Sequence, residues 1–173
     1  MTPATLRRNI TRGALHALVA DLARRPQAWR HLVSHDPTAR TYEQLSREEH
    51  VAVWLICWMD DHDTGFHDHD VSCGALAVAD GEVVEERLAV GRPPLRRAVR
   101  AGGVIDFGAS DIHRIAHAGD RPAVTIHAYS PPLWRMGAYE TLPTGELRRH
   151  SISYAEELRP LGQGITLVDG PGV

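Results

Sequence analysis

Three histidines have the residue type and the spacing of a metal site. His67 and His69 are separated by one residue, and in a β-strand residues two apart point to the same face. A third imidazole, His113, lies in a second β-like run at residues 111–115. Three neutral imidazoles suit iron, zinc, copper or nickel, whereas magnesium and calcium take oxygen ligands. The other interpretation is two solvent-facing histidines at positions 67 and 69 and a hydrogen-bonded core histidine at position 113.

A second group of polar side chains lies further along the chain. Thr125, His127 and Tyr129 alternate in a β-like run, so all three can face one cavity. The alternative is that His127 and Tyr129 form a hydrogen-bonded pair within the core.

Composition bounds the class of protein. A chain of 173 residues predicts one domain with a proper core, and 43% hydrophobic and 24% charged residues are ordinary for a globular protein. A net charge of −3 without a dense basic run gives no indication of nucleic-acid binding. Two cysteines do not suggest a disulfide framework. Without an N-terminal apolar segment or a long apolar span, we expect a cytoplasmic protein that binds no membrane.

The elements that must position these side chains can be predicted from hydrophobic periodicity. Residues 11–32 have helical spacing, and Pro26 predicts a break into two helices that pack on the rest of the domain. Residues 51–59 are a near-continuous apolar run, as in a strand buried inside a sandwich or barrel. Residues 74–79 and 82–85 predict a hairpin around Asp80-Gly81, and Pro93-Pro94 predicts a break before a strand at residues 95–100. Many short strands with turn signals indicate an antiparallel sandwich or barrel.

Such a barrel with a buried histidine cluster resembles a cupin jelly roll. We therefore predict a mainly β, single cupin domain over residues 1–173. It would have N-terminal helices in residues 1–35, a β-barrel in residues 40–155 and a C-terminal tail in residues 160–173. The wider cupin signature places a Glu four or five residues after the second His, whereas Gly74 stands five after His69. Three histidines without a carboxylate remain as the strong ligand candidates.

Four motifs in order resemble the cysteine dioxygenase family. That family pairs H-D-H with a later H-R-V and an S-x-H-x-Y-S-P-P segment. Here His67-Asp68-His69 is followed by Ile112-His113-Arg114-Ile115 and by residues 123–132, and Cys57-Trp58 precedes them. The resemblance runs from about Tyr42 to Tyr139.

The resemblance implies an Fe(II) site made by His67, His69 and His113. A substrate thiolate and O2 would take the open positions of the metal, and both oxygen atoms would end in a sulfinate. Thr125 stands where the family has Ser and keeps the hydroxyl of a Ser-His-Tyr relay. Tyr129 would donate a hydrogen bond to bound oxygen or substrate, and His127 would orient its phenol. The family's S-P-P segment further predicts a cis peptide bond between Ser130 and Pro131.

The sequence departs from the family at two places. Animal members link the Tyr to a Cys at the position of Gly74, and Cys73 would point to the other face, so we expect Tyr129 without a crosslink. Members that act on cysteine bind its carboxylate with an Arg, and alignment on Tyr42 places Gln44 there. Gln occupies that place in 3-mercaptopropionate dioxygenases, and a neutral amide cannot make the charged fork of Arg. Gln44 and Tyr42 are thus the predicted substrate-binding residues, while Arg40 or Arg47 could supply the charge instead.

These observations predict a monomeric non-heme Fe(II) thiol dioxygenase whose partners are O2 and a small thiol, either cysteine or a related mercapto-carboxylate. A 3-mercaptopropionate-type dioxygenase is the alternative within the same class. A non-catalytic cupin that binds a metal or a small ligand, for example as a sensor, is the alternative from another class. The intact Thr125, His127 and Tyr129 favour catalysis, because ligand storage needs no proton relay.

Overall fold

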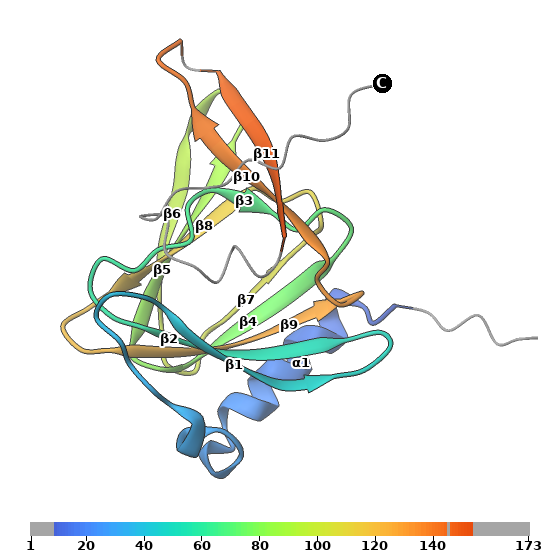
Figure 1. Cartoon of the computed structure of the whole chain (residues 1–173), viewed down its shortest axis with the longest axis vertical. Coiled ribbons are helices and arrows are strands. Elements are labelled where there is room, and N and C mark those ends of the chain that lie inside the picture. The colour runs from blue at the N-terminus through green and yellow to red at the C-terminus, as the bar shows by residue number, and fades with distance from the viewer. Residues whose placement is uncertain (1–8, 145, 154–173) are drawn as a thin grey trace, which may run out of the picture.

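The computed structural model describes residues 9–144 and 146–153, and most of them lie in β-strands (Figure 1). The strands are β1 (Thr41–Arg47), β2 (Ala52–Trp58), β3 (His67–Asp68), β4 (Cys73–Asp80), β5 (Glu82–Ala89), β6 (Arg92–Arg100), β7 (Val104–Phe107), β8 (His113–Ala118), β9 (Ala123–Ser130), β10 (Arg135–Thr141) and β11 (Leu147–Ser153). Before them the chain forms the helix α1 (Arg12–Ala23) and two 3₁₀ turns, η1 (Pro26–Ala28) and η2 (Arg30–Leu32). The predicted tail at residues 160–173 lies outside the described residues.

Two antiparallel sheets enclose the core. One sheet has the strand order β1-β2-β9-β4-β7, and the other has the order β11-β10-β3-β8-β5-β6. Apolar side chains from both sheets, among them Ile56, Leu76, Val83 and Ile115, form the cluster between them. A closed barrel would need a continuous ladder between the sheets, and the described strands pair only within each sheet. The barrel predicted from the sequence is therefore a pair of open sheets.

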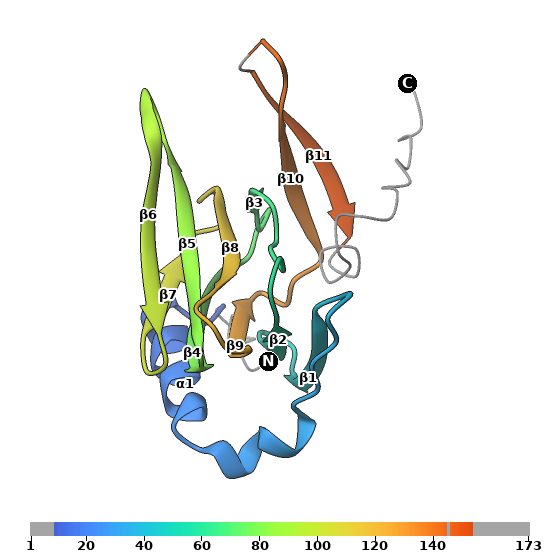
Figure 2. The ribbon, with the colours of Figure 1, turned by 90° about the vertical axis from the view of Figure 1, so that its left-hand side faces the viewer.

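The helix α1 covers the outer face of the five-stranded sheet (Figures 1 and 2). The Thr11 hydroxyl caps its first turn by accepting a hydrogen bond from the Ala14 amide at 3.3 Å. Leu15 and Val19 stand one turn apart and are fully buried against the sheet. Among the described residues, no helix combines the length and the apolar character that a membrane crossing needs.

The second predicted helix is wrong. Residues 26–32 form the two short turns η1 and η2 instead. Pro26 has no amide hydrogen to donate, and Trp29 between the turns has φ −139°, which lies outside the helical range. The apolar residues keep a helical spacing in this region, although the backbone is not α-helical there.

The predicted hairpin around Asp80-Gly81 is also wrong. β4 pairs with β7 and β9, whereas β5 pairs with β6 and β8, so the turn carries the chain from one sheet to the other. Gly81 has φ +72°, and an added Cβ would lie 2.7 Å from the Pro122 carbonyl oxygen. Only glycine fits this crossing, and an Asp-Gly turn has the same local signal whether or not its strands pair.

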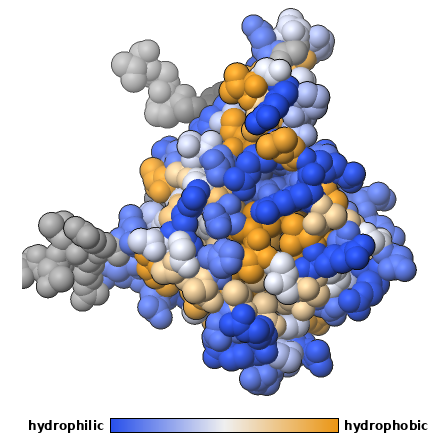
Figure 3. Space-filling view, turned by 180° about the vertical axis from the view of Figure 1, so that it is seen from behind, coloured by the Kyte–Doolittle hydropathy of each residue, from blue (hydrophilic) through white to orange (hydrophobic). Residues whose placement is uncertain are grey.

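The prolines at positions 93 and 94 lie within β6 and do not end it. Within the described residues β6 is an edge strand that pairs with β5, and an edge strand tolerates residues that cannot donate a backbone hydrogen bond. The β5-β6 and β10-β11 hairpins extend beyond the rest of their sheet on either side of β3 and β8 (Figure 2). On the face seen from behind, hydrophilic side chains surround a smaller apolar area (Figure 3).

Candidate active site

The three predicted ligand histidines meet between the sheets. His67 begins β3, His69 follows that strand, and His113 begins β8 and is paired with His67. Their ligand nitrogens all lie within 4.8 Å of one another, and each residue is at most 3% exposed. Among the described residues, they are the one group of His, Cys, Asp or Glu with the geometry of a metal site.

The chemistry of this cluster fits a transition-metal ion. Burial is the largest cause that lowers the pKa of His67 and of His69 well below 6.5, so both imidazoles are neutral and keep a lone pair. His69 Nδ1 and Nε2 and His113 Nε2 are buried without a hydrogen-bond partner in the described part of the chain. Buried imidazole nitrogens without a partner are costly, and a coordinated metal would satisfy one nitrogen of each ring.

The second predicted group forms a continuous hydrogen-bond chain on β9. Trp58 Nε1 donates to Thr125 Oγ1 at 2.7 Å, and Thr125 Oγ1 lies 2.8 Å from His127 Nε2. His127 Nδ1 lies 3.1 Å from the Tyr129 hydroxyl. All four residues are at most 3% exposed. The sequence identified the last three, and Trp58 joins them because β2 pairs with β9.

The indole fixes the direction of this chain. Burial lowers the pKa of His127 to about 3, so its ring is neutral and has one donor and one acceptor nitrogen. An indole N–H can only donate, and within the described residues the Thr125 hydroxyl has no acceptor other than His127 Nε2. His127 therefore carries its hydrogen on Nδ1 and donates it to Tyr129. The Tyr129 hydroxyl accepts this hydrogen bond and can donate its own hydrogen to a group other than His127.

The chain of hydrogen bonds ends beside the histidine cluster. The rings of Tyr129 and His69 have centroids 5.5 Å apart. Tyr129 lies near the end of β9, and the Ser130–Pro131 bond after it is cis, which confirms the prediction. Both predicted groups thus face the same interior space from opposite sheets.

Phe107 packs between these groups at the end of β7. Its ring stacks on His69 at a centroid distance of 4.2 Å and lies 4.7 Å from that of His113. Gly74 is paired with both Phe107 and Tyr129 in adjacent ladders. Cys73 Sγ points the other way, within 3.4 Å of the Ser130 carbonyl oxygen and among the residues under α1.

Asp68 ties the ligand strand to the β10-β11 hairpin. It accepts hydrogen bonds from Arg149 Nε at 2.7 Å, from the Tyr139 hydroxyl at 2.6 Å and from the Gly137 amide at 3.1 Å. Burial opposes ionisation, but the bonds from Arg149 and Tyr139 outweigh it and lower the pKa of Asp68. Since Asp68 points away from its two histidine neighbours along the strand, it anchors them from outside.

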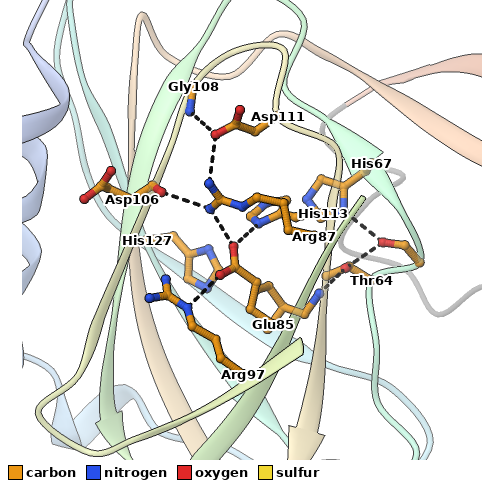
Figure 4. A network of polar contacts seen from close by, with 12 residues as sticks. Thr64, His67, Glu85, Arg87, Arg97, Asp106, Gly108, Asp111, His113 and His127 are labelled. Carbon is orange, nitrogen blue, oxygen red and sulfur yellow. Dashed lines mark hydrogen bonds and ion pairs between the residues drawn. The ribbon is translucent and has the colours of Figure 1, made fainter. Parts of the chain in front are cut away.

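A buried carboxylate, Glu85, backs the histidine cluster and was not identified from the sequence. It lies on β5 with 3% exposure, and one of its oxygens is 3.0 Å from His113 Nδ1 (Figure 4). Arg87 and Arg97 also contact its oxygens. Burial would raise the pKa of Glu85, but hydrogen bonds with His113 and Arg87 lower it to about 2, so the carboxylate is charged.

The predicted substrate residues differ in exposure. Gln44 and Tyr42 lie on β1, on the face that their partners Trp54 and Ile56 turn toward the core, but both are exposed at the edge of the sheet. Arg40, just before β1, is 3% exposed, and its guanidinium carbon lies 5.4 Å from the centroid of the Trp58 ring.

The charge of Arg40 reaches the histidines of both groups. Burial is the main cause of the lowered pKa of His67 and of His127, and the charge of Arg40 lowers both further. Arg47 is exposed. Of the two arginines that the sequence offered as partners for a substrate carboxylate, Arg40 is the buried one.

The fold defines the class of protein. Similar solved structures include a protein with a double-stranded β-helix domain from Klebsiella pneumoniae, with 12% identity and a TM-score of 0.52 over 69% of this chain and 91% of that chain. A cupin superfamily protein from Desulfitobacterium hafniense has 14% identity and a TM-score of 0.51 over 60% and 87%. A protein from Bacillus halodurans has 18% identity and a TM-score of 0.51 over 86% and 93%. These similarities show a cupin fold.

The family is shown by the sequence. The family model of cysteine dioxygenase type I matches residues 6–142. The chain belongs to that family, which confirms the resemblance of the motifs. A search of the curated proteins finds no significant match.

Proposed function

We propose that this protein is a non-heme Fe(II) thiol dioxygenase that converts a small thiol carboxylate and O2 into a sulfinate. The observation that carries the proposal is the meeting of three buried imidazoles with a hydrogen-bond chain that ends in Tyr129. A cytoplasmic location would suit it, because Cys57 and Cys73 are free thiols.

In this proposal His67, His69 and His113 would hold the iron. Fe(II) would bring a thiolate and O2 together and favour the ionised form of the thiol. Phe107 stacks on His69 and excludes water from one side of the ligands. Asp68 and Glu85 hold two of the ligand-bearing segments from behind.

Tyr129 serves as the hydrogen-bond donor to the reactants. Trp58, Thr125 and His127 orient it, because their chain of donors leaves the phenol proton for a group other than His127. When negative charge grows on the substrate, a hydrogen bond donated by Tyr129 lowers the free energy of that charge, and it does so strongly because the site is buried.

Arg40 is the proposed partner of the substrate carboxylate. It combines burial with proximity to the aromatic wall at Trp58 and with a charge that acts on His67 and His127. A guanidinium can bind a carboxylate with two parallel hydrogen bonds. Both cysteine and 3-mercaptopropionate carry this group, so Arg40 would select for thiol carboxylates over thiols without one. Gln44 and Tyr42, at the edge of β1, remain candidates for contacts with the rest of the substrate.

Oxygen consumption by iron-loaded protein with a panel of thiols tests the proposal. We expect turnover with cysteine or 3-mercaptopropionate, slower turnover with cysteamine, and a sulfinate as the product by mass spectrometry. His67→Ala, His69→Ala and His113→Ala should each abolish iron binding and turnover, with His16→Ala as the control because His16 is half-exposed beside Asp106. Iron binding without oxygen consumption by any thiol in the panel would instead favour the non-catalytic cupin.

A further inference from the structure

The buried carboxylate of Glu85 is held by three residues from three elements (Figure 4). Its Oε1 lies 3.0 Å from His113 Nδ1 and 2.7 Å from Arg87 Nη2. Its Oε2 accepts a hydrogen bond from Arg97 Nε at 2.9 Å. β5 lies between β6 and β8, and Glu85 is paired with Arg97 on one side and with Ile115 on the other.

We infer that Glu85 is a positioning residue of the metal centre: it fixes the orientation of His113 and strengthens that imidazole as a metal ligand through its charge. The inference rests on the proposed metal site. Arg87 and Arg97 pair with Glu85 at 2.7 and 2.9 Å, so its carboxylate is ionised and only accepts, and His113 carries a hydrogen on Nδ1. Nε2, which is buried without a hydrogen-bond partner among the described residues, is then the nitrogen of His113 left to coordinate a metal.

The three ligand histidines differ in the hydrogen-bond partners of their rings. His67 Nδ1 lies 3.0 Å from the neutral carbonyl oxygen of Gly65. Neither ring nitrogen of His69 has a hydrogen-bond partner in the described residues, and its ring stacks on Phe107. His113 is the ligand with an ionised partner. The candidate ligand set holds no carboxylate, so Glu85 supplies negative charge to the site through its hydrogen bond with His113.

The two arginines limit how much of that charge His113 receives. A buried carboxylate is costly unless it is paired, and both arginines pair with Glu85. Arg87 is itself held by Asp111 at 3.1 Å and by the Asp106 carbonyl oxygen at 3.1 Å, so its geometry is fixed. The Arg97 side chain is 53% exposed and therefore can be replaced without a large cavity. Removal of Arg97 would leave more of the Glu85 charge for His113.

A purely structural ion pair would behave differently. If Glu85 only joined β5 to its neighbouring strands, replacing Glu85 and replacing Arg97 would change the metal affinity of the site in the same direction. If Glu85 acts through its charge on His113, the first replacement weakens the metal affinity and the second strengthens it. Glu85→Gln suits this comparison, because the amide keeps the size of the side chain and an acceptor oxygen but removes the charge.

Co(II) titration of metal-free protein, followed by visible absorption, measures the effect without any need for turnover. Glu85→Gln should weaken Co(II) affinity about 10- to 100-fold, which is the usual effect of losing an outer partner of a metal-bound histidine. Arg97→Gln should bind Co(II) more tightly than the unmodified protein. Glu82→Gln is the matched control: it removes a carboxylate from the same strand, where Glu82 pairs with Arg100 at 2.8 Å, and should leave the affinity unchanged.

Equal Co(II) affinity in Glu85→Gln and the unmodified protein would overturn the inference, and so would equal weakening in Glu85→Gln and Arg97→Gln. If circular dichroism shows that Glu85→Gln does not fold, Arg97→Gln decides alone: tighter Co(II) binding supports the inference, and unchanged or weaker binding overturns it. Failure of the unmodified protein to bind Co(II) would remove the metal site itself and the proposed function with it. If the Co(II) affinities follow the expected order but the iron-loaded unmodified protein oxidises no thiol, the proposed function is overturned and the inference about Glu85 stands.

Discussion

The ring of Phe107 occupies the space that a side chain at Gly74 would need. A Cβ atom added to Gly74 would lie 2.4 Å from Phe107 Cε2 and 3.0 Å from the Ala128 carbonyl oxygen. Gly74 is paired with Tyr129. From the resemblance of its motifs, this is the position where we expected the crosslinking Cys of animal members to be replaced by Gly. Here an aromatic ring fills that position and stacks on His69. The same ring lies 6.0 Å from that of Tyr129, so Phe107 packs beside the phenol where position 74 has no side chain.

Gly74→Cys should destabilise the protein rather than create the crosslink. The new side chain must displace a buried aromatic ring, and such overpacking costs about 1–3 kcal/mol. Urea unfolding measures the loss, and mass spectrometry measures any thioether with Tyr129. The double variant Gly74→Cys with Phe107→Leu should recover part of the stability. A stable, crosslinked single variant would show that Phe107 does not block the site.

Thr125→Val should weaken catalysis while Thr125→Ser keeps it. Valine has nearly the same shape but removes the acceptor of Trp58 Nε1 and the donor to His127 Nε2. His127 is then no longer held in the form that donates to Tyr129, so we expect kcat to fall roughly 10- to 100-fold. Iron content should stay the same, because Thr125 does not contact the ligand cluster. Equal kcat values for the Val and Ser variants would contradict the proposed role of this hydrogen-bond chain.

Arg40→Met should raise KM for thiol carboxylates but not for cysteamine. A charged hydrogen bond contributes about 1.5–3 kcal/mol, which corresponds to a roughly 10- to 100-fold change in KM for cysteine and 3-mercaptopropionate. Arg47→Met is the matched control, because Arg47 is exposed on β1. Gln44→Arg tests the other assignment from the sequence. If it shifts kcat/KM toward cysteine while Arg40→Met has no effect, the carboxylate binds at Gln44.

His127 should make the metal-free protein sensitive to acid. Burial lowers the pKa of His127 to about 3, so below pH 6.5 the unfolded chain takes up a proton that the folded protein excludes. The stability from the neutral ring is fully present above pH 6.5 and is lost as pH falls toward 3. In this range the free energy of unfolding falls by up to about 1.4 kcal/mol per pH unit. Urea unfolding of His127→Gln should show a slope shallower by up to that amount, and parallel curves would contradict the shift.

The sequence was sufficient where the signal is local. The two-residue spacing of His67 and His69 and of Thr125, His127 and Tyr129 brings each group to one face, because side chains alternate along any strand. Short motifs in a fixed order also indicated the family, which the match over residues 6–142 confirms. Pro26 correctly predicted the break after α1, but the apolar spacing of residues 26–32 wrongly predicted a second helix, because it does not report the non-helical backbone of Trp29.

The contacts that join those groups were decided by the tertiary structure alone. Glu85 meets His113 across 28 positions and Trp58 meets Thr125 across 67, because β5 pairs with β8 and β2 pairs with β9. Nothing in the residues around Asp80-Gly81 distinguishes a hairpin from a crossing between sheets, and that crossing is what places Glu85 behind the ligands. A charged residue in a strand is usually solvated, so its role as an outer partner depends on the strands that bury it.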